Sequence, residues 1–170
     1  MCLTINNNDL NLVHLWVDAT YIIHDELKGH TGATTSIRKG GVTSISRKQN
    51  INTTSSTQSE IVGVYDFSPQ VMCTKYFLQN QGFHANNSVA YQDNKSDISL
   101  EKNGRTSSSN HKKHVNINYF FIQDHVDTGE LTVVHCPTDE MTGDYFTQPP
   151  EGDKFRKFGS QIMGLTDEEN

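Results

Sequence analysis

Strand-like segments alternate with helix-like segments along most of this chain, and this order constrains the fold more than any other feature. The clearest strand-like segment covers residues 12–23, where apolar side chains alternate with polar ones from Val13 to Thr20. A period of two residues is typical of a β-strand with one buried face. Alternation of strands with helices predicts one α/β domain, a mixed sheet of roughly five strands flanked by helices.

The other expected elements follow in chain order. They are a hairpin of residues 34–37 and 42–46, a helical segment at 55–82, a strand at 88–91, helices at 95–102 and 114–126, a strand at 131–135, and helices at 138–146 and 155–165. Hydroxyl side chains at 55–57, with Gln58 or Glu60, predict a capping box at the start of the long helical segment. Pro69 would cost ~3 kcal/mol inside a regular helix, so two helical pieces or a kink near Phe67 are expected.

Length and cysteine usage indicate one domain in a reducing compartment. A chain of 170 residues suits a single core, and its three cysteines have no framework spacing. We see neither a signal peptide nor an apolar run near the ~20 residues of a membrane span, so a cytoplasmic, monomeric protein without membrane contact is expected. The expected divisions are a truncated polar lead-in at 1–11, the domain at 12–165 and an acidic tail at 166–170.

The net charge of −6 argues against a protein that binds nucleic acid through bulk charge. It is compatible with a metal-dependent nuclease, whose acidic centre adds negative charge. Contacts to phosphates would then come from a local basic loop near residues 102–114, for which a solvated loop is the alternative. The candidate nucleic-acid-binding residues are Asn94, Lys102, Arg105, Lys112, Lys113 and His114.

Four carboxylates stand at ends of the predicted elements, where α/β folds place ligands. They are Asp18, Glu60, Asp93 and Asp144, and Glu60 is expected in the first turn of its helix. Each alone is more simply a turn, cap or helix-dipole residue. Together they suit phosphate hydrolysis, because carboxylate oxygens bind Mg²⁺ and two such ions can activate water and stabilise a leaving oxygen.

Other residue combinations suggest weaker alternatives. Cys73 with His135 and Cys136 would suggest zinc, but the chain has no C-x-x-C pair. Cys136 beside a histidine would suggest a thiol nucleophile, with a buried structural cysteine as the simpler interpretation. His135 precedes Asp144 and is a candidate proton shuttle. His30 and His114 are most simply structural.

Several motifs resemble, in order, those of copia-type retrotransposon ribonuclease H domains, over about residues 12–165. They are Trp16-Val17-Asp18-Ala19, Lys28-Gly29-His30-Thr31-Gly32, Ser46-Arg47-Lys48-Gln49, Thr53-Thr54-Ser55-Ser56-Thr57-Gln58-Ser59-Glu60, Tyr91-Gln92-Asp93-Asn94-Lys95-Ser96, Lys112-Lys113-His114-Val115-Asn116-Ile117, Pro137-Thr138-Asp139-Glu140 and Gly143-Asp144-Tyr145-Phe146-Thr147-Gln148-Pro149.

The resemblance implies a ribonuclease H-like fold and metal-dependent endonucleolytic cleavage of RNA paired to DNA. It implies that the catalytic, metal-binding residues are Asp18, Glu60, Asp93 and Asp144. The cofactor would be two Mg²⁺ ions, with Mn²⁺ as a substitute. The partners would be an RNA–DNA hybrid and the reverse transcriptase domain of a parent polyprotein, in the virus-like particle of an intact element.

Some positions depart from the family pattern. Asp97 stands where the family usually has Ala, and its charge would repel that of Asp93 four residues earlier. Gly143 replaces a usual Ala beside Asp144, which lowers helix propensity by ~1 kcal/mol. Further departures are Cys73, Asn118, Gln148 and Pro150. These changes keep an alternative open, in which the chain is a catalytically decayed relic that binds nucleic acid.

Overall fold

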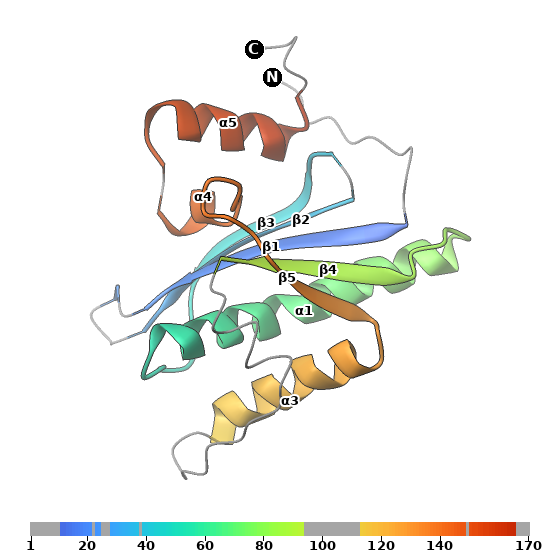
Figure 1. Ribbon diagram of the computed structural model, residues 1–170, viewed down its shortest axis with the longest axis horizontal. Helices are drawn as coiled ribbons and strands as arrows, with labels where there is room; N and C mark the ends of the chain where they lie inside the picture. The colour runs from blue at the N-terminus through green and yellow to red at the C-terminus, as the bar shows by residue number, and fades with distance from the viewer. Residues whose placement is uncertain are drawn as a thin grey trace.

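The computed structural model describes residues 11–21, 23–24, 28–37, 39–93, 113–148 and 150–165, and for 113–116 it describes the backbone alone. In these ranges the chain forms one five-stranded sheet with helices on both faces (Figure 1). The fold predicted from the sequence is therefore confirmed. None of the helices in these ranges is both long enough and apolar enough to cross a membrane.

The sheet is mixed and has the strand order β3-β2-β1-β4-β5. The strands are β1 (Leu12–Thr20), β2 (His30–Ser36), β3 (Gly41–Lys48), β4 (Asn87–Gln92) and β5 (Leu131–His135). β1, β2 and β3 form an antiparallel meander, whereas β1, β4 and β5 run parallel. Because β1 and β4 are parallel neighbours, their carboxyl ends meet at the same edge of the sheet.

The two faces of the sheet carry different helices (Figure 1). On one face lie α1 (Ser56–Asn80) and α3 (Lys113–Asp127), and on the other lie α4 (Asp144–Thr147) and α5 (Gly152–Met163). The alternating side chains of β1 point to these two faces in turn. Val13, Leu15 and Val17 are fully buried in the core beneath α1 and α3. Because side chains alternate along a strand, the intervening residues of β1 lie on the opposite face, which carries α4 and α5, and they are only partly buried.

The hairpin and the strands at 88–91 and 131–135 were predicted correctly, with β4 one residue longer at each end. β2 begins at His30, so the predicted start of the hairpin at residue 34 was wrong by four residues. Gly40 closes the hairpin with φ 73°, a conformation that costs glycine little. Gly129 follows α3 with the same φ and ends the helix predicted at 114–126.

The predicted break near Pro69 was wrong, because α1 is one helix of 25 residues with Pro69 inside it. Its buried side chains, among them Val64, Phe67 and Val71, pack into the core on both sides of the proline. Tertiary packing commonly outweighs an unfavourable local propensity of this size. The helix ends at Asn80 with Gln81 as its C-cap, and Gly82, the predicted stop, follows with a φ of 88°.

The helix predicted at 138–146 was also wrong. Residues 138–143 form turns held by i→i+3 bonds, and only the four residues of α4 are helical. Met141 is fully buried within these turns. α5 begins at Gly152, three residues before the predicted start, and ends before Gly164 with φ 68°.

Candidate active site

Asp18 and Asp93 come together because β1 and β4 are parallel neighbours. Trp16 pairs with Tyr91 across the two strands. Asp18 lies two residues after Trp16 within β1, and Asp93 lies two residues after Tyr91, directly after β4 ends at Gln92. Side chains two residues apart point to the same face of a sheet. Both carboxylates therefore lie at the carboxyl edge of the sheet, on the face that carries α4.

Glu60 reaches the same edge from α1. Its carboxylate Oε1 accepts a hydrogen bond of 3.2 Å from the backbone N–H of Ala19, directly after Asp18. Gly63 lets the helix approach, since a Cβ there would lie 3.2 Å from methyl groups of Val17 and Thr31. Glu60 is the fifth residue of α1, so its predicted place in the first turn was wrong.

The start of α1 is fixed by a capping arrangement close to the predicted one. The Ser55 hydroxyl accepts from the backbone N–H of Gln58 at 3.3 Å, and Gln58 Oε1 accepts from the Thr54 N–H at 2.9 Å. Gln49 is buried beside this turn and donates 2.8 Å hydrogen bonds to Thr31 Oγ1 and the Ser59 carbonyl. These bonds join α1 to β2 and set the position of Glu60 relative to Asp18.

Carboxylate oxygens of Asp18, Glu60 and Asp93 all lie within 4.8 Å of one another. Two ionised carboxylates about 4 Å apart repel by roughly 4 kcal/mol at an effective dielectric near 20. Burial raises the pKa of Asp18 to about 6, and the charges of Asp144 and Asp93 add to the rise, against a hydrogen bond from Thr147 that lowers it. The cluster is therefore poised to gain stability from a bound cation.

Asp144 lies close to this cluster but is not one of its three members. Its Oδ2 accepts a 3.0 Å hydrogen bond from Lys154 Nζ, and side-chain exposure at this ion pair is 17% for Asp144 and 33% for Lys154. Burial raises the pKa of Asp144, whereas Lys154 acts in the opposite direction. The structure thus brings together three of the four predicted carboxylates and pairs the fourth with a lysine.

α4 is seated directly on β1 and β2 at Asp18. Asp18 pairs with Gly32 across the two strands, and a Cβ on Gly32 would lie 2.7 Å from the Gly143 carbonyl oxygen. A Cβ on Gly143 would lie 2.9 Å from the Asp18 backbone nitrogen. The Thr147 hydroxyl donates a hydrogen bond to Asp18 Oδ2. Gly143, interpreted from the sequence as a loss of helix propensity, thus permits a close backbone contact beneath the site.

The proposed nucleic-acid-binding side chains lie outside what the structure describes. Asn94, Lys102, Arg105 and Lys112 are not among the described residues, and at Lys113 and His114 only the backbone is described. Asp97 and the helix predicted at 95–102 also lie outside the described ranges. The basic loop therefore stays a prediction.

Among the described residues, the carboxylate trio is the only group of His, Cys, Asp or Glu side chains arranged for a metal. The zinc alternative gains no support, since Cys73 is an exposed free thiol on α1 and Cys136 a buried one after β5. Burial raises the pKa of the Cys136 thiol to about 11, which opposes a role as nucleophile. His30 makes a 2.8 Å bond to Ser46, in keeping with a structural role.

Three supporting residues were not predicted from the sequence. Gln49 and Thr147 were noted only as parts of motifs, although both hold elements of the site in place. Lys154 carried no signal, because its meeting with Asp144 depends on the fold of the segment between α4 and α5.

Two polyproteins of plant transposons contain segments similar to this chain. The Pol polyprotein from transposon TNT 1-94 of Nicotiana tabacum is 29% identical over 141 residues, which is 83% of the chain and 10% of the polyprotein. The Pol polyprotein from transposon RE1 of Arabidopsis thaliana is 33% identical over 122 residues, which is 71% of the chain and 8% of the polyprotein. The chain thus spans about a tenth of the length of these relatives. No family model matches the sequence.

Solved structures of ribonucleases H share the fold at low sequence identity. LC11-RNase H1, isolated from compost, aligns over 80% of this chain and 92% of its own with a TM-score of 0.59 and 12% identity. RNase H1 from Halobacterium salinarum aligns over 79% and 93% with a TM-score of 0.51 and 13% identity. LC11-RNase H1 has also been solved in complex with an RNA/DNA hybrid, and that structure aligns with a TM-score of 0.51 and 13% identity.

Proposed function

The chain has the ribonuclease H fold and is related to plant retrotransposon Pol polyproteins. On this basis we infer that it is a metal-dependent endonuclease that cleaves the RNA strand of RNA–DNA hybrids. The observation that carries this proposal is the convergence of Asp18, Glu60 and Asp93 at one sheet edge. In the parent element this cleavage would remove template RNA during reverse transcription. The reverse transcriptase domain of the same polyprotein is the proposed neighbour, in the cytoplasm or in a virus-like particle.

The residues present suit Mg²⁺, with Mn²⁺ as a substitute. Mg²⁺ prefers hard carboxylate oxygens and retains water, and the trio offers such oxygens from three separate elements. We propose that Asp18, Glu60 and Asp93 hold the metal and that Asp144 completes a two-ion site. When bound, the metal would activate water and stabilise the leaving oxygen of an RNA phosphate.

The remaining site residues position these carboxylates. The Thr147 hydroxyl and the backbone of Gly143 orient Asp18, while the Ala19 N–H orients Glu60. Lys154 pairs with Asp144 beside the cluster and adds a positive charge at the edge where phosphate would arrive. Recognition of a hybrid would depend on minor-groove shape and 2′-hydroxyl contacts rather than on base sequence.

Cleavage of a labelled RNA–DNA hybrid tests the proposal. The wild-type chain should cut the RNA strand with Mg²⁺ and not with EDTA, and Asp93→Asn should abolish cutting without loss of folding. Asp124→Asn on the exposed surface of α3 is the matched control and should cut like wild type. Undiminished cleavage by Asp93→Asn would remove the proposal.

The pairing of Asp144 with Lys154 favours a second candidate, a non-catalytic nucleic-acid-binding relic. In that case the hybrid would bind with a dissociation constant that is the same with Mg²⁺, Mn²⁺ or EDTA, and no cutting would occur with either ion. The hybrid assay therefore separates the two candidates.

A further inference from the structure

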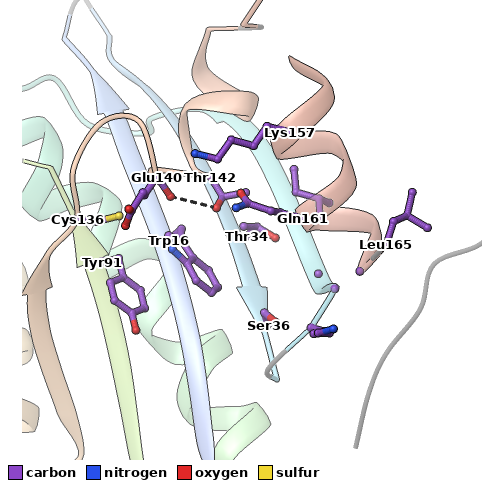
Figure 2. Close-up of a pocket in the computed structure, with 15 residues that line it drawn as sticks. Trp16, Thr34, Ser36, Tyr91, Cys136, Glu140, Thr142, Lys157, Gln161 and Leu165 are labelled. Atoms are coloured by element: carbon purple, nitrogen blue, oxygen red, sulfur yellow. Dashed lines mark hydrogen bonds between the residues drawn. The ribbon is translucent and has the colours of Figure 1, made fainter. Parts of the chain in front are cut away.

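A second concave site lies between the sheet and α5, on the face opposite α1 (Figure 2). Its volume is about 590 Å³, within the ~300–1,000 Å³ typical of small-molecule pockets. Trp16, Thr34 and Tyr91 line the sheet side, and Lys157 and Gln161 project from α5 across from them. The carboxylates of Asp18, Glu60 and Asp93 are not among the lining residues.

The sheet side of this cavity carries nearly parallel aromatic rings. Trp16 and Tyr91 stack with ring centroids 5.0 Å apart and an angle of 16° between the planes. His14, two residues before Trp16 on β1, stacks against both rings at 5.6 and 5.8 Å. Both Trp16 and Tyr91 are only partly buried, so this aromatic group offers ring surface that α5 does not cover. Rings of this kind bind flat aromatic groups such as nucleobases by stacking.

The other walls supply positive charge and hydrogen-bonding groups. Among the described residues that line the cavity, Lys39 and Lys157 are basic and Glu140 alone is acidic, in a chain whose net charge is −6. Lys157 Nζ donates one 2.8 Å hydrogen bond to the Asp139 carbonyl and has three protons to donate. Ser36 is buried and lines the cavity, and its hydroxyl has no hydrogen-bond partner within the part of the chain that the structure describes. An unsatisfied buried hydroxyl is unfavourable and is relieved by a polar ligand or water.

We propose that this cavity binds a nucleotide, with its base stacked on Trp16 and Tyr91 and its phosphate near Lys157. The nucleotide is either free in solution or an unpaired residue of a nucleic-acid strand. The second source fits the placement of the cavity, since Trp16 lies two residues from Asp18 on the same face of β1, roughly 7 Å along the strand. A strand with one base in the cavity would thus lead toward the carboxylates.

Trp16 is the only tryptophan of the chain, which makes its fluorescence a direct reporter of this cavity. Wild-type protein in EDTA is titrated with AMP, with ribose 5-phosphate and with a five-residue single-stranded oligoadenylate. Quenching by AMP and oligoadenylate, but not by ribose 5-phosphate, is expected for a nucleotide site. Quenching by the oligoadenylate and not by AMP would support an unpaired strand residue as the ligand and exclude the free nucleotide. Absence of quenching by both AMP and the oligoadenylate at millimolar concentration, or equal quenching by ribose 5-phosphate, would overturn the proposal.

Two substitutions on α5, one at a residue that lines the cavity and one at its neighbour, test the phosphate position without changing the sheet. Lys157→Ala should weaken binding about twofold to fivefold, as for an exposed ionic contact. Arg156→Ala removes the same charge from the adjacent residue, which pairs with Asp153 and does not line the cavity, and binding should stay unchanged. Equal effects of the two substitutions would contradict a phosphate near Lys157.

Equilibrium dialysis of labelled AMP tests stacking without relying on fluorescence. Trp16→Phe should retain binding, whereas Trp16→Leu should weaken it by on the order of 10-fold. Equal binding by both variants would overturn the stacking arrangement. All these measurements are made in EDTA without cleavage, so their outcome is independent of whether the proposed nuclease activity is found.

Discussion

Replacing Asp18 with Asn should stabilise the metal-free protein, although Asp18 is placed here at the centre of the site. Burial is the main cause that raises the pKa of Asp18 from 3.8 to about 6. One pKa unit corresponds to ~1.36 kcal/mol, so ionised Asp18 at pH 7.5 costs the fold about 3 kcal/mol relative to its neutral form. Asn is neutral and of similar shape. Asp18→Asn is therefore expected to raise the free energy of unfolding by about 2–3 kcal/mol.

The pH dependence gives the sign of this effect. Because the pKa of Asp18 is higher in the folded state, the folded protein binds more protons than the unfolded chain between about pH 4 and pH 6. The stability linked to this proton is present in full below pH 3.8 and is lost as the pH rises through about 6. Asp18→Asn should thus match wild type near pH 3.5 and exceed it at pH 7.5.

Urea unfolding in EDTA, followed by circular dichroism at the two pH values, measures the difference. Asp124→Asn is the control, because it removes one carboxylate from the exposed surface of α3 and should shift stability by less than ~0.5 kcal/mol. Saturating Mg²⁺ should stabilise wild type and not Asp18→Asn. A destabilising buried charge at Asp18 would be refuted if Asp18→Asn were no more stable than wild type at pH 7.5, or if its higher stability persisted at pH 3.5.

Three further substitutions and one control test α4, the charge near the carboxylates and α1. Gly32→Ala should displace α4, since a Cβ there would lie 2.7 Å from the backbone of that helix. It should reduce hybrid cleavage about 10-fold or more and lower the free energy of unfolding by about 1–3 kcal/mol. The control is Gly159→Ala, where a Cβ would meet no described atom within 4 Å; in urea unfolding it should be neutral or stabilising, and cleavage should stay unchanged. Lys154→Ala removes the positive side chain that pairs with Asp144, and calorimetry should show Mg²⁺ binding about twofold to fivefold tighter. Weaker binding would contradict competition between the Lys154 ammonium and Mg²⁺ for Asp144. Pro69→Ala in α1 should raise the thermal midpoint and stabilise by about 1–3 kcal/mol, and a lower midpoint would show that the proline is favourable there.

The elements that the sequence predicted correctly are those whose signal is local. The period of two along β1 placed Asp18 on the face opposite the core, and the Ser55–Gln58 cap placed the start of α1. For the same reason, most predicted strand boundaries lie within one or two residues of those in the structure. The resemblance to copia-type ribonucleases H added which acidic residues belong together, and three of these four carboxylates do converge.

The parts that sequence reasoning missed depend on contacts between distant segments. α1 stays continuous through Pro69 because core packing on both sides outweighs a local cost. The turns at 138–143 replace a helix where Gly143 lies against Asp18, a contact between residues 125 positions apart. The cavity beside Trp16 and Tyr91 arises from the parallel register of β1 and β4 together with the placement of α5, which no local pattern specifies.

The proposed function requires that Asp18 on β1, Glu60 on α1 and Asp93 directly after β4 share bound cations. A crystal structure of the wild-type chain soaked with Mn²⁺ tests it most directly, because anomalous scattering locates the ions without assumptions about activity. Anomalous peaks are expected among Asp18, Glu60 and Asp93 and should be absent from crystals of Asp93→Asn. Crystals saturated with Mn²⁺ that show no peak among these three side chains would contradict it.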